Sequence, residues 1–147
     1  MKKFARVLAL MLVATMLCAM LVACGAKPAS DPKEAKDALE ENGYKATHLS
    51  GVLVEAASSA FGDGVTDIVT GIDGDDSVTI VWFEEEDDAK DFYEELEEKY
   101  EESKAELDEI EDEDVKEELQ EELDNAAYGI SGNMVWMGTK EAVKAAK

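Results

Sequence analysis

Cysteine and histidine are nearly absent from this sequence. Its 147 residues include two cysteines and one histidine, and both cysteines lie within the first 24 residues. The rest of the chain can form no disulfide, so a hydrophobic core must stabilise any domain that it builds. The single histidine, His48, argues against a zinc cluster and against a Ser-His-Asp catalytic arrangement, and we interpret it as a structural or exposed strand residue.

Basic residues are also scarce, with 14 lysines and arginines against 36 aspartates and glutamates. Nucleic-acid binding needs a basic face to meet the phosphates, and this chain offers none, so we exclude a nucleic-acid partner. The sequence also lacks a phosphate-cradling glycine motif, an HExxH motif and a GxSxG motif.

The first 23 residues have the layout of an export signal. Lys2, Lys3 and Arg6 form a basic start, and the following residues 7–23 carry no charge. A membrane-spanning helix is the alternative, but this apolar run lies at the short end of what a bilayer core of ~30 Å requires. The residues at its end decide between the two.

Those residues, Leu21-Val22-Ala23-Cys24, resemble the bacterial lipobox at every position. The resemblance implies transfer of a diacylglyceryl group to the Cys24 thiol, cleavage between Ala23 and Cys24, and localisation at the cell membrane on its extracytoplasmic face. Two or more acyl chains are enough for stable anchoring. The remaining chain is similar to the small acidic lipoproteins of unassigned function found in Gram-positive bacteria.

We therefore expect a cleaved signal peptide at 1–23, a tether at 24–32 and a single domain at 33–147. Three of the 14 basic residues and none of the 36 acidic ones lie in 1–23, so the rest has 11 basic residues and a net charge of −25. Such a charge opposes contact with an anionic membrane surface.

Apolar spacing and turn residues predict the secondary structure. We expect a helix opened by Asp31-Pro32 and stopped by Asn42-Gly43. Further along, we expect a strand at 44–49, a short helix within 51–61, strands at 66–72 and 77–83, a long acidic helix from 84 with a break at 111–114, a strand pair within 128–138 and a final helix capped by Thr139.

The order of these elements predicts an α+β fold, with helices on one face of an antiparallel sheet. It matches the split βαβ, ferredoxin-like layout with extra terminal helices. In that layout the stripe of Phe92, Leu96 and Tyr100 would pack against strand residues Ile68, Ile80 and Trp82.

Two groups of side chains are candidate sites. Asp73, Asp75 and Asp76 offer oxygen ligands for calcium, although their spacing also suits a polar hairpin turn, which we favour. Trp82 and Trp136 could form an aromatic platform for a sugar or peptide, although two strand tryptophans more often belong to a core. The many carboxylate pairs of the acidic helix single out no catalytic acid, because none has a recognisable apolar pocket.

We expect a lipid-anchored module that binds an unknown protein or small-molecule ligand and is not an enzyme. A calcium-responsive domain that uses Asp73 to Asp76 or the acidic helix is the alternative, and a cell-wall hydrolase is a remote one.

Overall fold

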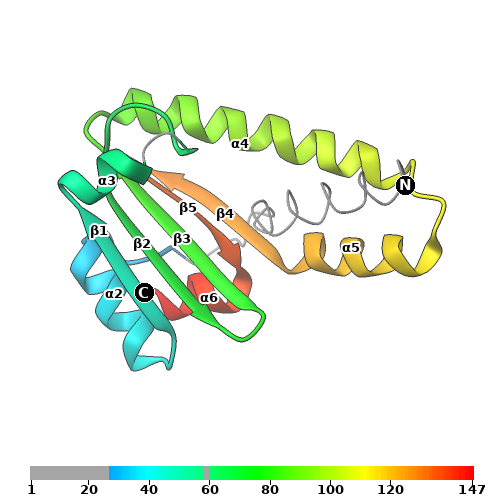
Figure 1. Cartoon of the computed structure of the whole chain (residues 1–147), viewed down its shortest axis with the longest axis horizontal. Helices are drawn as coiled ribbons and strands as arrows, with labels where there is room; N and C mark the ends of the chain where they lie inside the picture. Colours follow the sequence, from blue (N-terminus) through cyan, green and yellow to red (C-terminus); the bar gives the residue numbers. More distant parts are fainter. Residues whose placement is uncertain (1–26, 58–59) are drawn as a thin grey trace.

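A computed structural model describes residues 27–57 and 60–147 of the chain (Figure 1). In chain order the elements are α2 (Pro32–Glu41), β1 (Lys45–Ser50), α3 (Val52–Ala57), β2 (Val65–Asp73), β3 (Asp76–Phe83), α4 (Glu86–Leu107), α5 (Glu113–Asn125), β4 (Ala126–Ser131), β5 (Met134–Thr139) and α6 (Lys140–Ala145).

The strands form one five-stranded sheet with the order β1-β2-β3-β5-β4, and every neighbouring pair is antiparallel. Two tight hairpins account for most of this order. In the first, Asp73 pairs with Asp76 and Gly74 takes a positive φ of 60°. In the second, Ser131 pairs with Met134 and Gly132 takes a φ of 59°. Glycine is suited to both turns because left-handed backbone carries no steric penalty there.

The predicted α+β class and antiparallel sheet are confirmed. The split βαβ arrangement is wrong, because it requires β1 and β2 to run parallel with another strand between them. Here Ser50, at the end of β1, lies opposite Asp67, near the start of β2, so the two strands are adjacent and antiparallel. The intervening α3 has six residues and is ~9 Å long, too short to return along the ~20 Å of β1.

Helices cover both faces of the sheet, and not one face as predicted. On one face, α2 and α6 pack against strand residues that include Val69, Ile80 and Trp136. On the other face, α4 packs against the alternate strand residues, including Ile68 and Val81 (Figure 1). Both sides of β3 and β5 are therefore buried, as expected for strands whose apolar residues do not alternate with polar ones.

This two-faced core corrects the predicted partners of the α4 stripe. Leu96 and Tyr100 do pack with Ile68, but Ile80 and Trp82 belong to the opposite core. Successive strand residues point to opposite faces, so Val81 and Phe83 take the places that were assigned to Ile80 and Trp82.

The predicted helix boundaries are confirmed where capping residues set them. The Asp31 carboxylate accepts hydrogen bonds from the Lys33 and Glu34 amides at the start of α2. The Thr139 hydroxyl accepts one from the Ala142 amide at the start of α6. The long acidic helix does break, but earlier than the predicted 111–114, since α4 ends at Leu107 and α5 begins at Glu113 after the Asp112 cap.

Close packing in the sheet predicts a contrast between two glycine substitutions. A Cβ at Gly138 would lie 2.6 Å from Cα of Val78 and against the Ser77 carbonyl, and backbone atoms there cannot move aside. A Cβ at Gly71 would meet only the tip of the Leu39 side chain, 2.9 Å from its Cδ1. We expect Gly138→Ala to destabilise the protein by about 1 to 3 kcal/mol in urea unfolding, and Gly71→Ala by less. Equal losses would contradict this packing.

Candidate functional site

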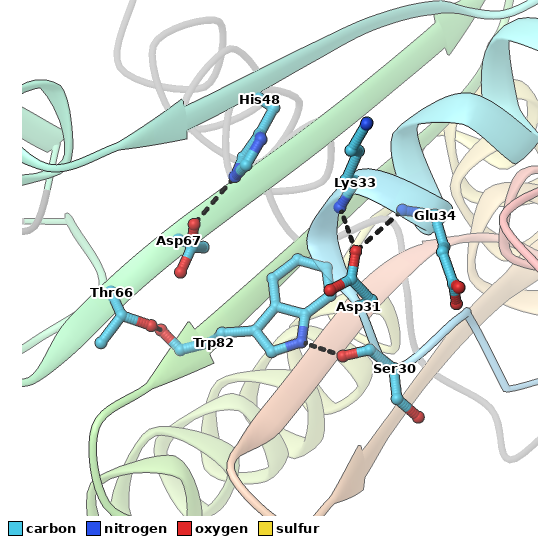
Figure 2. Close-up of polar contacts among 8 residues, drawn as sticks. All are labelled: Ser30, Asp31, Lys33, Glu34, His48, Thr66, Asp67 and Trp82. Atoms are coloured by element: carbon cyan, nitrogen blue, oxygen red, sulfur yellow. Dashed lines mark hydrogen bonds and ion pairs between the residues drawn. The ribbon is translucent and has the colours of Figure 1, made fainter.

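The segment that leads into the domain is part of the fold. Pro28 is buried, and the Ala29 amide donates a hydrogen bond of 2.8 Å to the Ala146 carbonyl at the end of α6. The indole Nε1 of Trp82 donates one of 2.9 Å to the Ser30 carbonyl, beside the Asp31 cap (Figure 2). The chain is therefore held by specific contacts from Pro28 onward.

These contacts move the predicted domain boundary. Residues 28–32 were assigned to the tether, but they pack on the same face of the sheet as α2 and α6. The sequence could not predict this packing, because it depends on Trp82 and Ala146, which are far from Ser30 along the chain. Residues 28–32 are therefore part of the folded domain and not of a free tether.

The predicted lipidation site, Cys24, lies outside the described residues, as does the predicted signal peptide at 1–23. Among the described residues, no helix combines the length and the apolar character needed to cross a membrane.

Residues 84–124, here called the acidic arm, form the second prominent feature. The arm holds 24 acidic residues and four lysines. The first part of α4 lies over the sheet, and the rest extends beyond it before α5 runs back to β4 (Figure 1). Its buried residues are Ala89, Leu96, Tyr100 and Leu107 of α4 and Leu119 of α5.

The carboxylates of the acidic arm face solvent. None of them is buried, and only Asp88 and Glu122 are even half-buried. A carboxylic acid that donates a proton near neutral pH usually lies in an apolar pocket. The arm therefore presents a charged surface and no desolvated carboxylate.

The predicted calcium ligands occupy the tip of the β2–β3 hairpin. Asp73 and Asp75 are exposed and Asp76 is half-buried. Within the part of the chain that the structure describes, no three aspartate, glutamate, histidine or cysteine side chains come together as a metal site, so these three do not converge. They do bear on Tyr44, whose pKa is raised by burial and then by the charges of Asp76, Asp73 and Glu141.

His48 has a partner that the sequence did not reveal. Its Nε2 lies 2.8 Å from Oδ1 of Asp67, and both side chains are 26% exposed (Figure 2). The contact joins β1 to β2, since Ser50 pairs with Asp67 and His48 with Val69. His48 is therefore a half-buried structural residue, as the sequence predicted.

Trp82 and Trp136 are core residues, which confirms the favoured interpretation. They are 4% and 7% exposed and belong to the same apolar cluster under α2 and α6. Neither ring is available as a platform for a sugar or peptide, and the Trp82 indole nitrogen already has a partner in Ser30.

The aromatic residues on the opposite face also belong to the core. Tyr93 of α4 stacks on Tyr128 of β4 with ring centroids 5.4 Å apart, and Tyr100 lies 6.2 Å from Tyr128. Phe92 completes the row by contacting Phe83 at 5.6 Å. Tyr93 and Tyr100 thus attach α4 to the edge strand β4, and Phe92 attaches it to β3.

A comparison with protein-family models, with curated proteins and with solved structures found no match to this chain.

Because the aspartates of the hairpin do not converge, we expect calcium to stabilise the protein equally whether or not one of these carboxylates is removed. With a net charge of −25 outside residues 1–23, the protein should gain thermal stability from any added cation by screening. We expect the shift in melting temperature in millimolar calcium to match that in sodium chloride of equal ionic strength, and to be the same for Asp75→Asn. A larger calcium shift that disappears in Asp75→Asn would establish the calcium site.

The four tyrosines predict a loss of stability at alkaline pH. Burial is the main cause that raises the pKa of all four tyrosines above 10.0, and Tyr128 and Glu97 raise that of Tyr93 further. Because the unfolded chain releases these protons first, stability is complete below pH 10.0 and falls as the pH rises above it.

Ultraviolet titration of tyrosinate, recorded together with circular dichroism, tests this expectation. Tyrosinate should form only as the protein unfolds, and the stability of Tyr93→Phe should fall less steeply with pH. Ionisation of Tyr93 near pH 10 in the folded state would contradict it.

Proposed function

We propose that this protein is a lipid-anchored lipoprotein on the extracytoplasmic face of a bacterial cell membrane, and that its folded domain is a binding or interaction module without enzymatic activity. The observation that carries the proposal is the order of three features along the chain. A basic start and an apolar run at 1–23 are followed by the lipobox ending at Cys24 and then by a folded domain in which Pro28 is already buried.

The entry of the chain into the domain supports this assignment. Lipidation at Cys24 would leave Gly25, Ala26 and Lys27 before Pro28, the first buried residue of the part that the structure describes. From there the Ala29 and Ser30 backbone is hydrogen-bonded to α6 and to Trp82. A pull on the anchor would thus be carried directly into the core of the domain.

A binding role is supported by the chemistry of the described residues. The one histidine is engaged with Asp67, both tryptophans fill the core, and the carboxylates of the acidic arm are solvated. These side chains stabilise the fold or charge its surface. A domain with a projecting charged arm is suited to contact a partner near the membrane.

Substitution of each cysteine tests the anchor. We expect Cys24→Ala to abolish incorporation of a labelled fatty acid and to leave the leader attached, because the thiol is the acceptor of the diacylglyceryl group. Cys18→Ala is the matched control, since it also removes a thiol from the N-terminal region and should leave both steps intact.

Mass spectrometry of the intact protein supplies the measurement. Wild type and Cys18→Ala should lack residues 1–23 and carry the mass of a lipid. If Cys24→Ala is processed to the same mass as wild type, the lipoprotein assignment is wrong.

A further inference from the structure

The charge of this protein is divided between the two faces of its sheet. On one face, residues 27–44 and 140–147, here called the anchor-side layer, contain α2, α6 and the leading segment. This layer has six lysines and six acidic residues, so its net charge is zero. The acidic arm on the opposite face has a net charge of −20. The whole excess of negative charge therefore lies outside the anchor-side layer.

The anchor-side layer is also where the chain enters the domain. Pro28 is buried there, Ala29 is bonded to Ala146 of α6, and Ser30 is bonded to Trp82, which lies beneath this layer. The two helices of the layer are joined as well, since the Asn42 side chain donates to the Ala145 carbonyl. The leading segment from Ala29 and the two helices of the anchor-side layer are therefore connected by hydrogen bonds.

The connection to the proposed anchor is short. Four residue steps separate Cys24 from Pro28, which at ~3.3 to 3.6 Å per residue reach roughly 14 Å. Electrostatic screening at physiological salt extends over ~8 Å. Even at full extension of this connection, Pro28 stays within about two screening lengths of the lipid headgroups, so the surface charge of the domain still influences which face it turns to them.

We propose that the anchor-side layer lies against an anionic bilayer, and that the acidic arm points away from it. The proposal rests on the lipid anchor at Cys24. An anionic surface repels the arm but does not repel the neutral layer. The short connection and the charge therefore favour the same orientation. The exposed lysines Lys27, Lys33 and Lys144 then lie at the headgroup level, while the arm is presented to partners in solution.

The lysines of the chain can report this orientation without added labels. The protein is purified with its lipid and placed in vesicles of anionic phosphatidylglycerol, and an amine-reactive reagent is added outside. The acylation rate of each lysine is measured by peptide mass spectrometry. It is divided by the rate of the same lysine in a reference sample, in which the lipid has been cleaved from the protein and the protein is in solution without detergent. We expect several-fold slower acylation at Lys27, Lys33 and Lys144 on the vesicles, and unchanged rates at Lys99 and Lys104 of the arm.

A pair of charge-reversal variants separates orientation from simple attachment. Lys33→Glu with Lys144→Glu makes the anchor-side layer acidic, and the protection of Lys27 should then be lost. Lys99→Glu with Lys116→Glu makes the same change in charge on the arm and should retain that protection. The proposal would be overturned if, in the wild type, acylation slowed equally in both sets of lysines or slowed more in the arm. It would also be overturned if the protection had the same size on vesicles of neutral phosphatidylcholine.

Failure of the anchor is distinguished by the mass of the N-terminal peptide. If Cys24 carries no lipid, the chain from Cys24 to Lys147 is coupled through its single thiol to vesicles that bear maleimide lipid, and the lysine rates are measured in the same way. The orientation is then supported or overturned whatever the cell does to Cys24.

Discussion

The structure depends on burying both faces of β3 and β5. These two strands lie inside the sheet, and every residue of β5 and the last four of β3 are buried. Outside the first 24 residues the chain has no cysteine with which to form a disulfide, and its charges repel one another, so apolar contact must supply the stability. One cluster under α2 and α6 and a second under α4 supply that contact, and the helices are held through them.

The same requirement explains how the protein accommodates a helix as acidic as α4. Glutamates four residues apart, such as Glu94 and Glu98, oppose the helix by a few tenths of a kcal/mol per pair. Burial of a single large apolar side chain contributes about 1.5 to 3 kcal/mol, and Leu96 and Tyr100 are each 5% exposed. The stacking of Tyr93 on Tyr128 adds to this attachment. Packing therefore outweighs repulsion where α4 lies over the sheet, and the carboxylates of the arm remain on its solvent-exposed surface.

Segregation of charge gives the two faces different roles in the proposed function. The neutral face receives the chain from the proposed anchor, through Ala29 and Ser30, while the charged face extends into solvent. A protein attached so closely to a bilayer would be pushed off it if its excess charge were spread evenly. The arrangement of α2 and α6 against α4 and α5 resolves that conflict.

Short-range chemistry made a large part of the fold predictable. Asp31, Thr139 and Asp112 have side chains that cap the helix that follows each of them, and the glycines of both hairpin turns tolerate a positive φ. Such interactions act between residues close in sequence, which is why the strands, the hairpins and the break in the acidic helix could be placed. The layout of the first 24 residues is equally local, and it alone indicates the proposed anchor.

Tertiary structure decided what depends on residues far apart in the chain. Pairing of β1 with β2 excluded the split βαβ order, and the alternation of β3 sent Trp82 to the face opposite the one predicted. The partners His48 and Asp67, and Ser30 and Trp82, meet only once the sheet has formed. Local patterns determine which segments become helices and strands, but the face that each segment covers is set by the side of the sheet on which its apolar residues find partners. In this protein, the side of the sheet on which each helix packs placed the entry of the chain on the neutral face and the acidic arm on the opposite face.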